Sequence, residues 1–89
     1  MEFQREPGRI YAMNGEKLVA EVTFPERDGV AVIDHTFVDD SLRGQGVAGA
    51  LVRAAADQIR AEGQKARVTC SYAQVWFQNH PEEQDLLAR

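Results

Sequence analysis

Three glycines, Gly44, Gly46 and Gly49, stand within six residues at the start of a segment that is otherwise patterned as a helix. Glycine inside a helix lowers stability by about 0.5–1 kcal/mol relative to alanine, so the cluster needs a compensating role. A helix N-terminus presents unpaired backbone N–H groups and the positive end of the helix dipole, and phosphate groups bind there. The glycines therefore predict an anion-binding loop, with a flexible loop that binds no ligand as the alternative.

Two well-known phosphate-binding loops fit this segment poorly. A P-loop requires Gly-Lys-Ser/Thr, whereas Val47 and Ala48 follow Gly46. The G-x-G-x-x-G spacing of a dinucleotide fingerprint is present at residues 44–49. That fingerprint follows the first strand of its fold and is completed by an acidic residue at the end of the next strand. Neither condition is met here. The expected strand before the loop is the third, and no acidic residue ends the strand that follows the helix.

The single cysteine is the second candidate for chemistry. We expect Cys70 at the end of a strand over residues 65–70, directly before Ser71, the predicted N-cap of the next helix. The positive end of that helix favours the thiolate, which could accept an acyl group and pass it on. His35, on a neighbouring strand, could exchange a proton with the thiol. The alternatives are a small buried core cysteine and a strand histidine without a role.

Other side chains near these candidates have simpler interpretations. Arg43 could pair with a phosphate, or with Asp39 or Asp40 in an exposed ion pair. Tyr72 and Trp76 lie at helical spacing and are predicted to be core residues, with contact to a cofactor or an acyl acceptor as the alternative. The acidic residues near the C-terminus are expected to form a solvated surface, with attraction of a cationic amine as the alternative: Glu82, Glu83 and Asp85.

Hydrophobic periodicity predicts the elements that must position these residues. Alternating or apolar runs indicate strands over residues 9–13, 17–24, 30–38 and 65–70, with Asn14-Gly15 as a hairpin turn. Helices are expected over residues 47–62, capped by Gly63, and from Ser71, with Gln74 completing a capping box, to Pro81. The first helix should bury one apolar stripe: Val47, Leu51, Val52, Ala55 and Ile59.

The order of these elements predicts an α+β fold. Three strands in an antiparallel meander are followed by a helix that crosses to a parallel fourth strand, in a mixed, mostly antiparallel sheet with helices packed on it. At 89 residues the chain has room for one domain. A net charge of −4, with no cluster of basic residues, argues against nucleic-acid binding.

Composition also bears on location and cofactors. The sequence has no apolar run of the roughly 20 residues that span a membrane, and no secretory signal pattern at its N-terminus. One cysteine cannot form an internal disulfide, which favours a reducing, cytoplasmic location. The spacing of His35, His80 and Cys70 matches no metal site, so no metal is expected.

Residues 43–48, Arg-Gly-Gln-Gly-Val-Ala, resemble the acetyl-CoA signature of the GNAT acetyltransferase superfamily. That signature is Arg or Gln, two residues, Gly, one residue, then Gly or Ala; Arg43, Gly46 and Ala48 fill its specified positions. The segments IDHTFV, VTCSY and WFQNHPEEQDLL extend the likeness to a small one-domain GNAT-like group, from about residue 9 to residue 87.

The resemblance implies that residues 1–89 are a single acetyl-CoA-binding domain of an N-acetyltransferase. In the superfamily the loop amides hold the CoA pyrophosphate, which gives the candidate cofactor-binding residues Arg43, Gly44, Gln45, Gly46, Val47 and Ala48. The GNAT-like group carries a cysteine and a histidine at the places of Cys70 and His35, which are the candidate catalytic residues. Its donor would be acetyl-CoA and its acceptor an amine, on a small molecule or a protein, that the sequence does not specify.

The short length leaves a second function open. Larger GNAT enzymes carry additional helices and strands that build the acceptor pocket, and most of these are missing from 89 residues. The alternative is therefore a non-catalytic module that binds CoA or a protein partner. Both functions account for the glycine loop, but only the enzyme gives Cys70 and His35 a joint role.

Overall fold

The fold combines two hydrogen-bonded sheets with helices packed against them. The structure is a computed structural model, which describes residues 2–88. Within this range one sheet has the strand order β1-β2-β3-β6: β1 (Gln4–Glu6), β2 (Arg9–Asn14), β3 (Lys17–Thr23) and β6 (His35–Val38). The other has the order β4-β5-β7: β4 (Glu26–Arg27), β5 (Val30–Ile33) and β7 (Ala66–Val68). The helices are α1 (Val47–Ala61) and α2 (Ser71–Gln78), with 3-10 segments η1 (Asp40–Leu42) and η2 (Pro81–Leu86).

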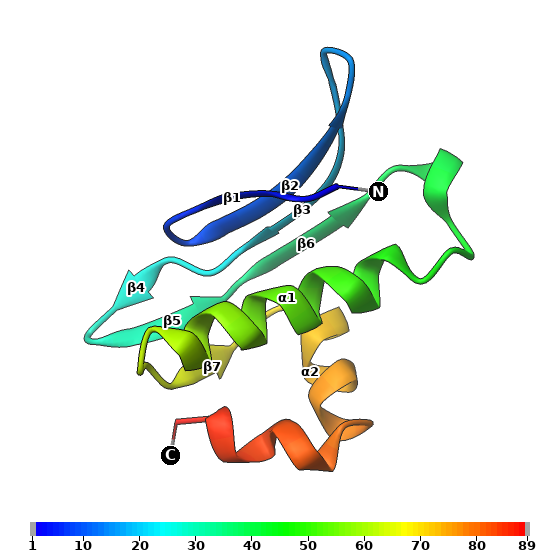
Figure 1. Cartoon of the computed structure of the whole chain (residues 1–89). Coiled ribbons are helices and arrows are strands. Elements are labelled where there is room, and N and C mark those ends of the chain that lie inside the picture. The colour runs from blue at the N-terminus through cyan, green and yellow to red at the C-terminus, as the bar shows by residue number, and fades with distance from the viewer. Residues whose placement is uncertain (1, 89) are drawn as a thin grey trace.

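The α+β class and the parallel crossover are confirmed. β5 and β7 are parallel neighbours, with Ala31 opposite Ala66 and Ile33 opposite Val68. α1 makes the connection between the two strands, as Figure 1 shows. The meander is antiparallel from β1 to β3, and β6 joins it in antiparallel register with β3.

The predicted strand over residues 30–38 changes its partner at Asp34. Before this residue β5 pairs with β7, and after it β6 pairs with β3. The Asp34 N–H donates to the carbonyl of Thr23, 3.2 Å away, which turns the chain toward β3. The carbonyl of Ile33 accepts from the N–H groups of both Thr69 and Cys70, so the chain after β7 ends its pairing here. β6 is consequently the last strand of its sheet, with an open edge.

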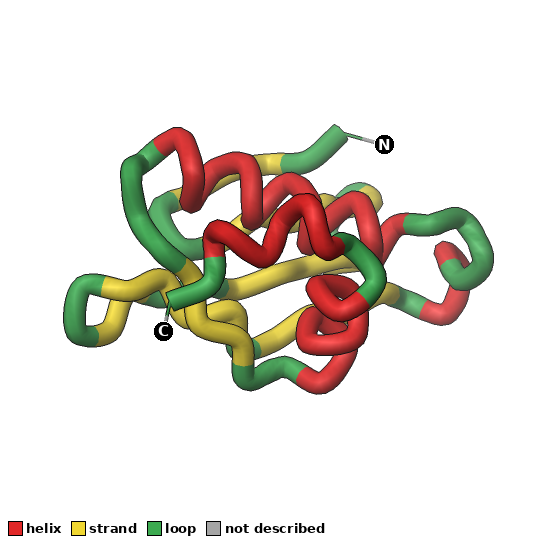
Figure 2. The backbone as a smooth tube through the Cα atoms, turned by 90° about the horizontal axis from the view of Figure 1, so that it is seen from below, coloured by secondary structure: helices red, strands yellow, loops and turns green. Residues whose placement is uncertain are grey.

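The helix α1 buries the stripe that the sequence predicts. All five predicted residues are buried, and Leu51, Val52 and Ile59 have no exposed surface. These side chains belong to the core between α1 and the first sheet, where α1 contacts β2, β3 and β6. Figure 2 shows the helices lying against the strands. Full burial of one such aliphatic side chain contributes about 1.5–3 kcal/mol, so this layer stabilises the fold substantially. Gly63, at φ +71°, ends the helix as expected.

Several local predictions were wrong in detail. The β2–β3 hairpin turns at Gly15 and Glu16, with Asn14 already paired to Lys17. The strand predicted over residues 65–70 is only Ala66–Val68. Cys70, not Ser71, is the N-cap of α2, and the Gln74 amide donates to the Val68 carbonyl rather than completing a capping box.

The strand β1 is absent from the sequence prediction. Its three residues are all exposed, so they lack the alternation that marks a strand. Among the described residues, no helix has both the length and the apolar character required to cross a bilayer.

Candidate active site

A cavity of about 470 Å³ lies between β6, the glycine loop and the start of α2. We call it the glycine-loop groove. Thr36 and Val38 of β6 form one wall, the segment from Leu42 to Gly49 forms another, and Tyr72 of α2 closes one side. Its size is within the range of small-molecule sites. Five of the six predicted cofactor-binding residues line it; Gln45 is the one that does not.

Backbone conformation explains the glycines of this loop. Gly44 and Gly46 have φ of +80° and +74°, where a side chain is strained, although a Cβ at either position would meet nothing within 4 Å. Gly46 is the N-cap of α1 and offers no side chain to the first-turn amides. The first helical hydrogen bond runs from Ala50 N–H to the Gly46 carbonyl, at 3.1 Å. The amides of the first turn therefore have no intrahelical acceptor and are available to an anion.

Arg43 makes the ion pair that the sequence offers as its alternative role. Its Nε lies 2.8 Å from the Asp40 carboxylate, and the two side chains are 77% and 88% exposed. Such an exposed pair is weak, so a phosphate in the groove can compete for the guanidinium.

Cys70 lies next to the groove through its contact with Thr36. The sulfur is 3.5 Å from the Thr36 hydroxyl oxygen, and Thr36 itself lines the groove. Burial raises the pKa of the Cys70 thiol, but the Thr36 hydroxyl and then the backbone amides of Ala73 and Tyr72 favour the thiolate. These interactions outweigh burial, and the pKa of Cys70 lies below its ordinary value.

His35 lies on the other face of β6 from Cys70. Consecutive strand residues point to opposite faces, so His35 points away from the side where Thr36 meets the sulfur. Its Nε2 lies 3.5 Å from a carboxylate oxygen of Glu21 on β3. The other Glu21 oxygen accepts from Arg9 Nε at 2.6 Å. The structure thus places Cys70 with Thr36, and His35 with Glu21.

Tyr72 corrects the prediction of a core residue. It is 42% exposed and lines the groove, whereas Trp76 is buried as predicted. A Cβ built on Gly49 would lie 3.6 Å from the Tyr72 hydroxyl, so the phenol stands over the first turn of α1. The buried stripe of α2 is Ala73, Trp76 and Phe77, an i, i+3, i+4 spacing that the sequence contains. That spacing could have excluded Tyr72 from the core.

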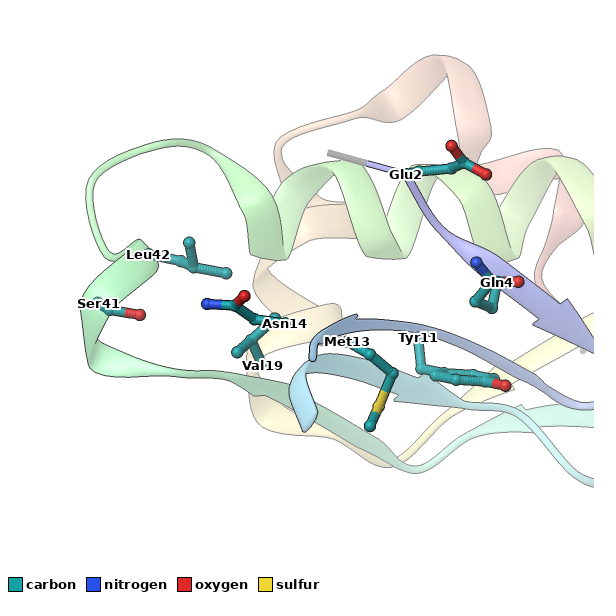
Figure 3. Close-up of a pocket in the computed structure, with 8 residues that line it drawn as sticks. All are labelled: Glu2, Gln4, Tyr11, Met13, Asn14, Val19, Ser41 and Leu42. Atoms are coloured by element: carbon teal, nitrogen blue, oxygen red, sulfur yellow. The ribbon is translucent and has the colours of Figure 1, made fainter. Parts of the chain in front are cut away.

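A second cavity, of about 630 Å³, lies beside the groove (Figure 3). Residues of β1, the β2–β3 hairpin and η1 line it, including Tyr11, Asn14 and Ser41. Leu42 is the residue that both cavities share. Polar amide, hydroxyl and carboxylate groups thus line a cavity next to the groove.

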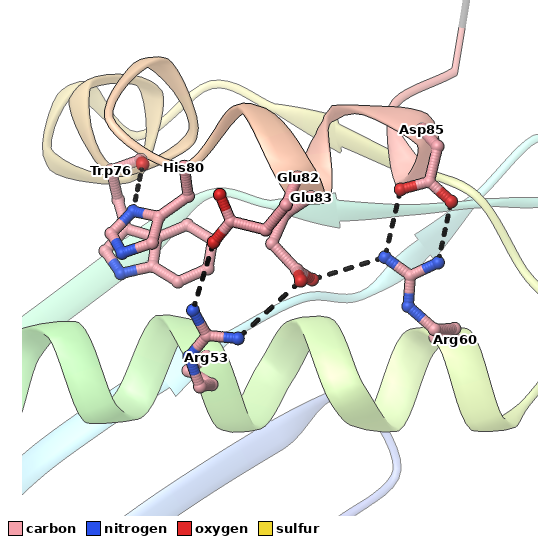
Figure 4. A network of polar contacts seen from close by, with 7 residues as sticks. All are labelled: Arg53, Arg60, Trp76, His80, Glu82, Glu83 and Asp85. Atoms are coloured by element: carbon pink, nitrogen blue, oxygen red, sulfur yellow. Dashed lines mark hydrogen bonds and ion pairs between the residues drawn. The ribbon is translucent and has the colours of Figure 1, made fainter.

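The far half of α1 is held to η2 by ion pairs (Figure 4). Arg60 donates to Asp85 at 2.8 Å and to Glu83 at 3.2 Å. Arg53 lies 3.6 Å from both Glu82 and Glu83. The acidic segment, expected as a solvated surface, is therefore paired with α1. Between residues 2 and 88, no group of three His, Cys, Asp or Glu side chains is placed to hold a metal.

Comparison with known proteins agrees with this architecture. The family model described as GCN5-related N-acetyl-transferase matches residues 9–86. The chain belongs to this family. A solution structure of a GCN5-like protein from Staphylococcus aureus superposes with a TM-score of 0.79 at 29% identity, over 98% of this chain and 87% of that chain. The ribosomal-protein-alanine N-acetyltransferase of Brucella melitensis shares the fold, with a TM-score of 0.55 at 20% identity over 91% of this chain and 61% of that chain.

Curated relatives of this acetyltransferase-family chain include Protein NATD1. The Xenopus tropicalis protein is 41% identical over 49 residues, which are 55% of this chain and 45% of that protein. The Homo sapiens protein is 40% identical over 55 residues, 60% of this chain and 49% of that protein. The matched region thus spans about half the length of these relatives.

Proposed function

We propose that this chain is an acetyl-CoA-dependent N-acetyltransferase acting on an amine that is not yet identified. One observation carries the proposal: the bare N-terminus of α1, the open edge of β6 and the Cys70–Thr36 contact meet at one groove. An anion site and an extended binding edge suit the diphosphate and the pantetheine arm of CoA, and a thiolate beside them could accept the acetyl group.

Each part of acetyl-CoA has a chemical counterpart in the groove. The diphosphate fits the amides of the loop from Gly44 to Ala48, with Arg43 able to leave Asp40 for a phosphate oxygen. The amides of the pantetheine arm suit the open edge of β6, since an edge strand has unpaired N–H and C=O groups. Tyr72 offers an exposed aromatic surface at the same groove.

The transfer uses Cys70 as the first acetyl acceptor in our proposal. The thiol loses its proton to solvent, the thiolate attacks the acetyl carbonyl carbon, and the carbon–sulfur bond to CoA breaks, releasing CoA as a thiolate. An amine nitrogen then attacks the acetyl-cysteine, which regenerates the Cys70 thiolate. The amine loses a proton to solvent in this step, because His35, the base that the sequence predicted, faces Glu21 on the other face of β6.

Incubation with acetyl-CoA tests the proposal. Intact mass spectrometry of the protein reports an acetyl adduct, and free-thiol release reports turnover in the presence of a panel of small amines and peptides. We expect both in the unmodified chain and loss of the adduct in Cys70→Ser.

The outcomes separate the competing functions. Turnover without an adduct, retained in Cys70→Ser, assigns direct transfer from CoA to the amine. Calorimetric binding of acetyl-CoA without any thiol release points to the non-catalytic CoA-binding module. No binding at all overturns the proposal.

A further inference from the structure

We propose that Thr36 is the positioning residue for Cys70: its hydroxyl holds the sulfur beside the glycine-loop groove and donates a hydrogen bond to the thiolate. The role in acyl transfer rests on the proposed function, whereas the contact itself can be tested without any substrate. Thr36 takes the place that the sequence suggested for His35 as the partner of the thiol.

The backbone around both residues leaves the sulfur little freedom. The Cys70 N–H donates to the Ile33 carbonyl at 3.2 Å, and the Cys70 carbonyl accepts from Gln74 N–H at 3.0 Å. Thr36 is in register with Val22, which has no exposed surface, so it lies on a strand anchored in the core. With both main chains held, the separation of 3.5 Å between sulfur and hydroxyl oxygen is set by the fold.

The chemistry of the contact favours the ionised form. While Cys70 is a thiol, its S–H donates to the Thr36 oxygen. After the proton leaves to solvent, the hydroxyl can rotate and donate to the sulfur. A hydrogen bond to a charged acceptor is about twice as strong as one between neutral groups, so Thr36 stabilises the thiolate more than the thiol. Burial opposes ionisation, which makes this one hydroxyl important.

Titratable side chains on the surrounding elements are otherwise engaged or turned away. His35 of β6 faces Glu21, and Arg67 of β7 is exposed, alternating with the inward-facing Ala66 and Val68. Tyr72 of α2 lines the groove, and its hydroxyl stands over Gly49 of α1. Thr36 is therefore the side chain whose removal should change the titration of Cys70.

The experiment measures the rate of iodoacetamide alkylation against pH, without acetyl-CoA. Cys70 is the single cysteine of the chain, so the reaction reports one thiol. The variants are Thr36→Val, which replaces the hydroxyl by a methyl of similar shape, Thr36→Ser, which keeps the hydroxyl, and His35→Asn. Thr69→Val is the matched control, because it makes the same change at an exposed threonine next to Cys70.

We expect Thr36→Val to raise the midpoint pH of the alkylation curve by about one unit. The alkylation rate at pH 7 then falls about tenfold. Thr36→Ser should restore the midpoint, and Thr69→Val and His35→Asn should leave it in place. Thermal unfolding of each variant verifies that the chain remains folded.

An unchanged midpoint in Thr36→Val overturns the inference, as does an equal shift in His35→Asn or Thr69→Val. If Thr36→Val is poorly folded, Thr36→Ser decides: loss of the low midpoint in that folded variant refutes a role for the hydroxyl. If the titrations agree but acetyl-CoA releases no thiol, the proposed function fails and the positioning role of Thr36 stands.

Discussion

The two ends of α1 are built in opposite ways. At the N-terminus Gly46 supplies no capping side chain, the first turn contains no acidic residue, and the amides border an open groove. Toward the C-terminus Arg60 lies in the last turn, where a cation compensates the helix dipole, and Gly63 terminates the helix. Arg53 and Arg60 also tie the helix to the acidic residues of η2.

Within α1, the groups that stabilise the helix thus lie toward its C-terminus, whereas the groups available to a ligand lie at its N-terminus. Ion pairs, dipole compensation and a glycine cap hold the far end, so the near end can leave its positive dipole uncompensated. An anion that binds there supplies the missing charge and acceptors. The comparison can be tested by exchanging properties between the two ends.

Gly46→Glu should abolish acetyl-CoA binding, because it adds bulk and negative charge where a phosphate must approach. Gly63→Glu is the matched variant at the other end of α1: both glycines have positive φ, +74° and +71°, and open space around them. The shared strain should lower the free energy of unfolding of both variants by about 1–2 kcal/mol. Calorimetry with acetyl-CoA and urea unfolding check the two effects. Equal affinities in the two variants would remove the distinction between the ends.

Ala48→Asp should make the protein more stable and a weaker binder. A carboxylate in the first turn compensates the dipole and contributes about 0.3–1 kcal/mol to stability. The same charge repels the diphosphate, and we expect the Kd for acetyl-CoA to rise about tenfold or more, equivalent to about 1.4 kcal/mol. Ala48→Asn is the neutral control and should keep most of the affinity. Stabilisation with undiminished binding would place the diphosphate elsewhere.

Asp40→Asn should strengthen acetyl-CoA binding slightly. It frees Arg43 from its exposed ion pair at the edge of the groove, so that the guanidinium can meet a phosphate without competition. The expected gain is about two- to threefold, and Arg43→Ala should lose a similar factor. Both effects should shrink in high salt. Calorimetry at two salt concentrations measures them, and an Arg43→Ala variant that binds as tightly as the unmodified chain would assign no role to this side chain.

Asp85→Asn should lower the Tm modestly at neutral pH and not at acid pH. The hydrogen bond from Arg60 lowers the pKa of Asp85 against an opposing effect of burial. The ionised carboxylate therefore stabilises the fold above the ordinary carboxyl range, and this contribution disappears as the pH falls through the lowered pKa. The Tm difference between the unmodified chain and the variant should close below about pH 4. Asp57→Asn, at an exposed position on α1, the helix that carries Arg60, is the control. A Tm difference between the unmodified chain and Asp85→Asn that persists at pH 2 would show that the Arg60–Asp85 contact does not depend on ionisation of the carboxyl group.

Features set by local pattern could be predicted from the sequence. The 3.6-residue periodicity of α1 and the glycine that ends it identify the helix, its buried face and the loop before it, because each depends on neighbouring residues alone. The parallel pairing of β5 and β7 follows from the strand–helix–strand order. For the same reason the glycine loop could be placed at a helix N-terminus, where an anion site is expected.

Tertiary contacts alone decided how the candidate site is assembled. The sequence shows one apolar run over residues 30–38, but the competition between β7 and β3 for pairing divides it at Asp34 and opens the edge of β6. That division sets which residue of the His35-Thr36 pair faces Cys70, since alternate strand residues point to opposite faces. Tyr72 is exposed because the first turn of α2 stands at this opening. Long-range pairing has no signature within a single segment, and the thiol's partner therefore emerged only from the folded structure.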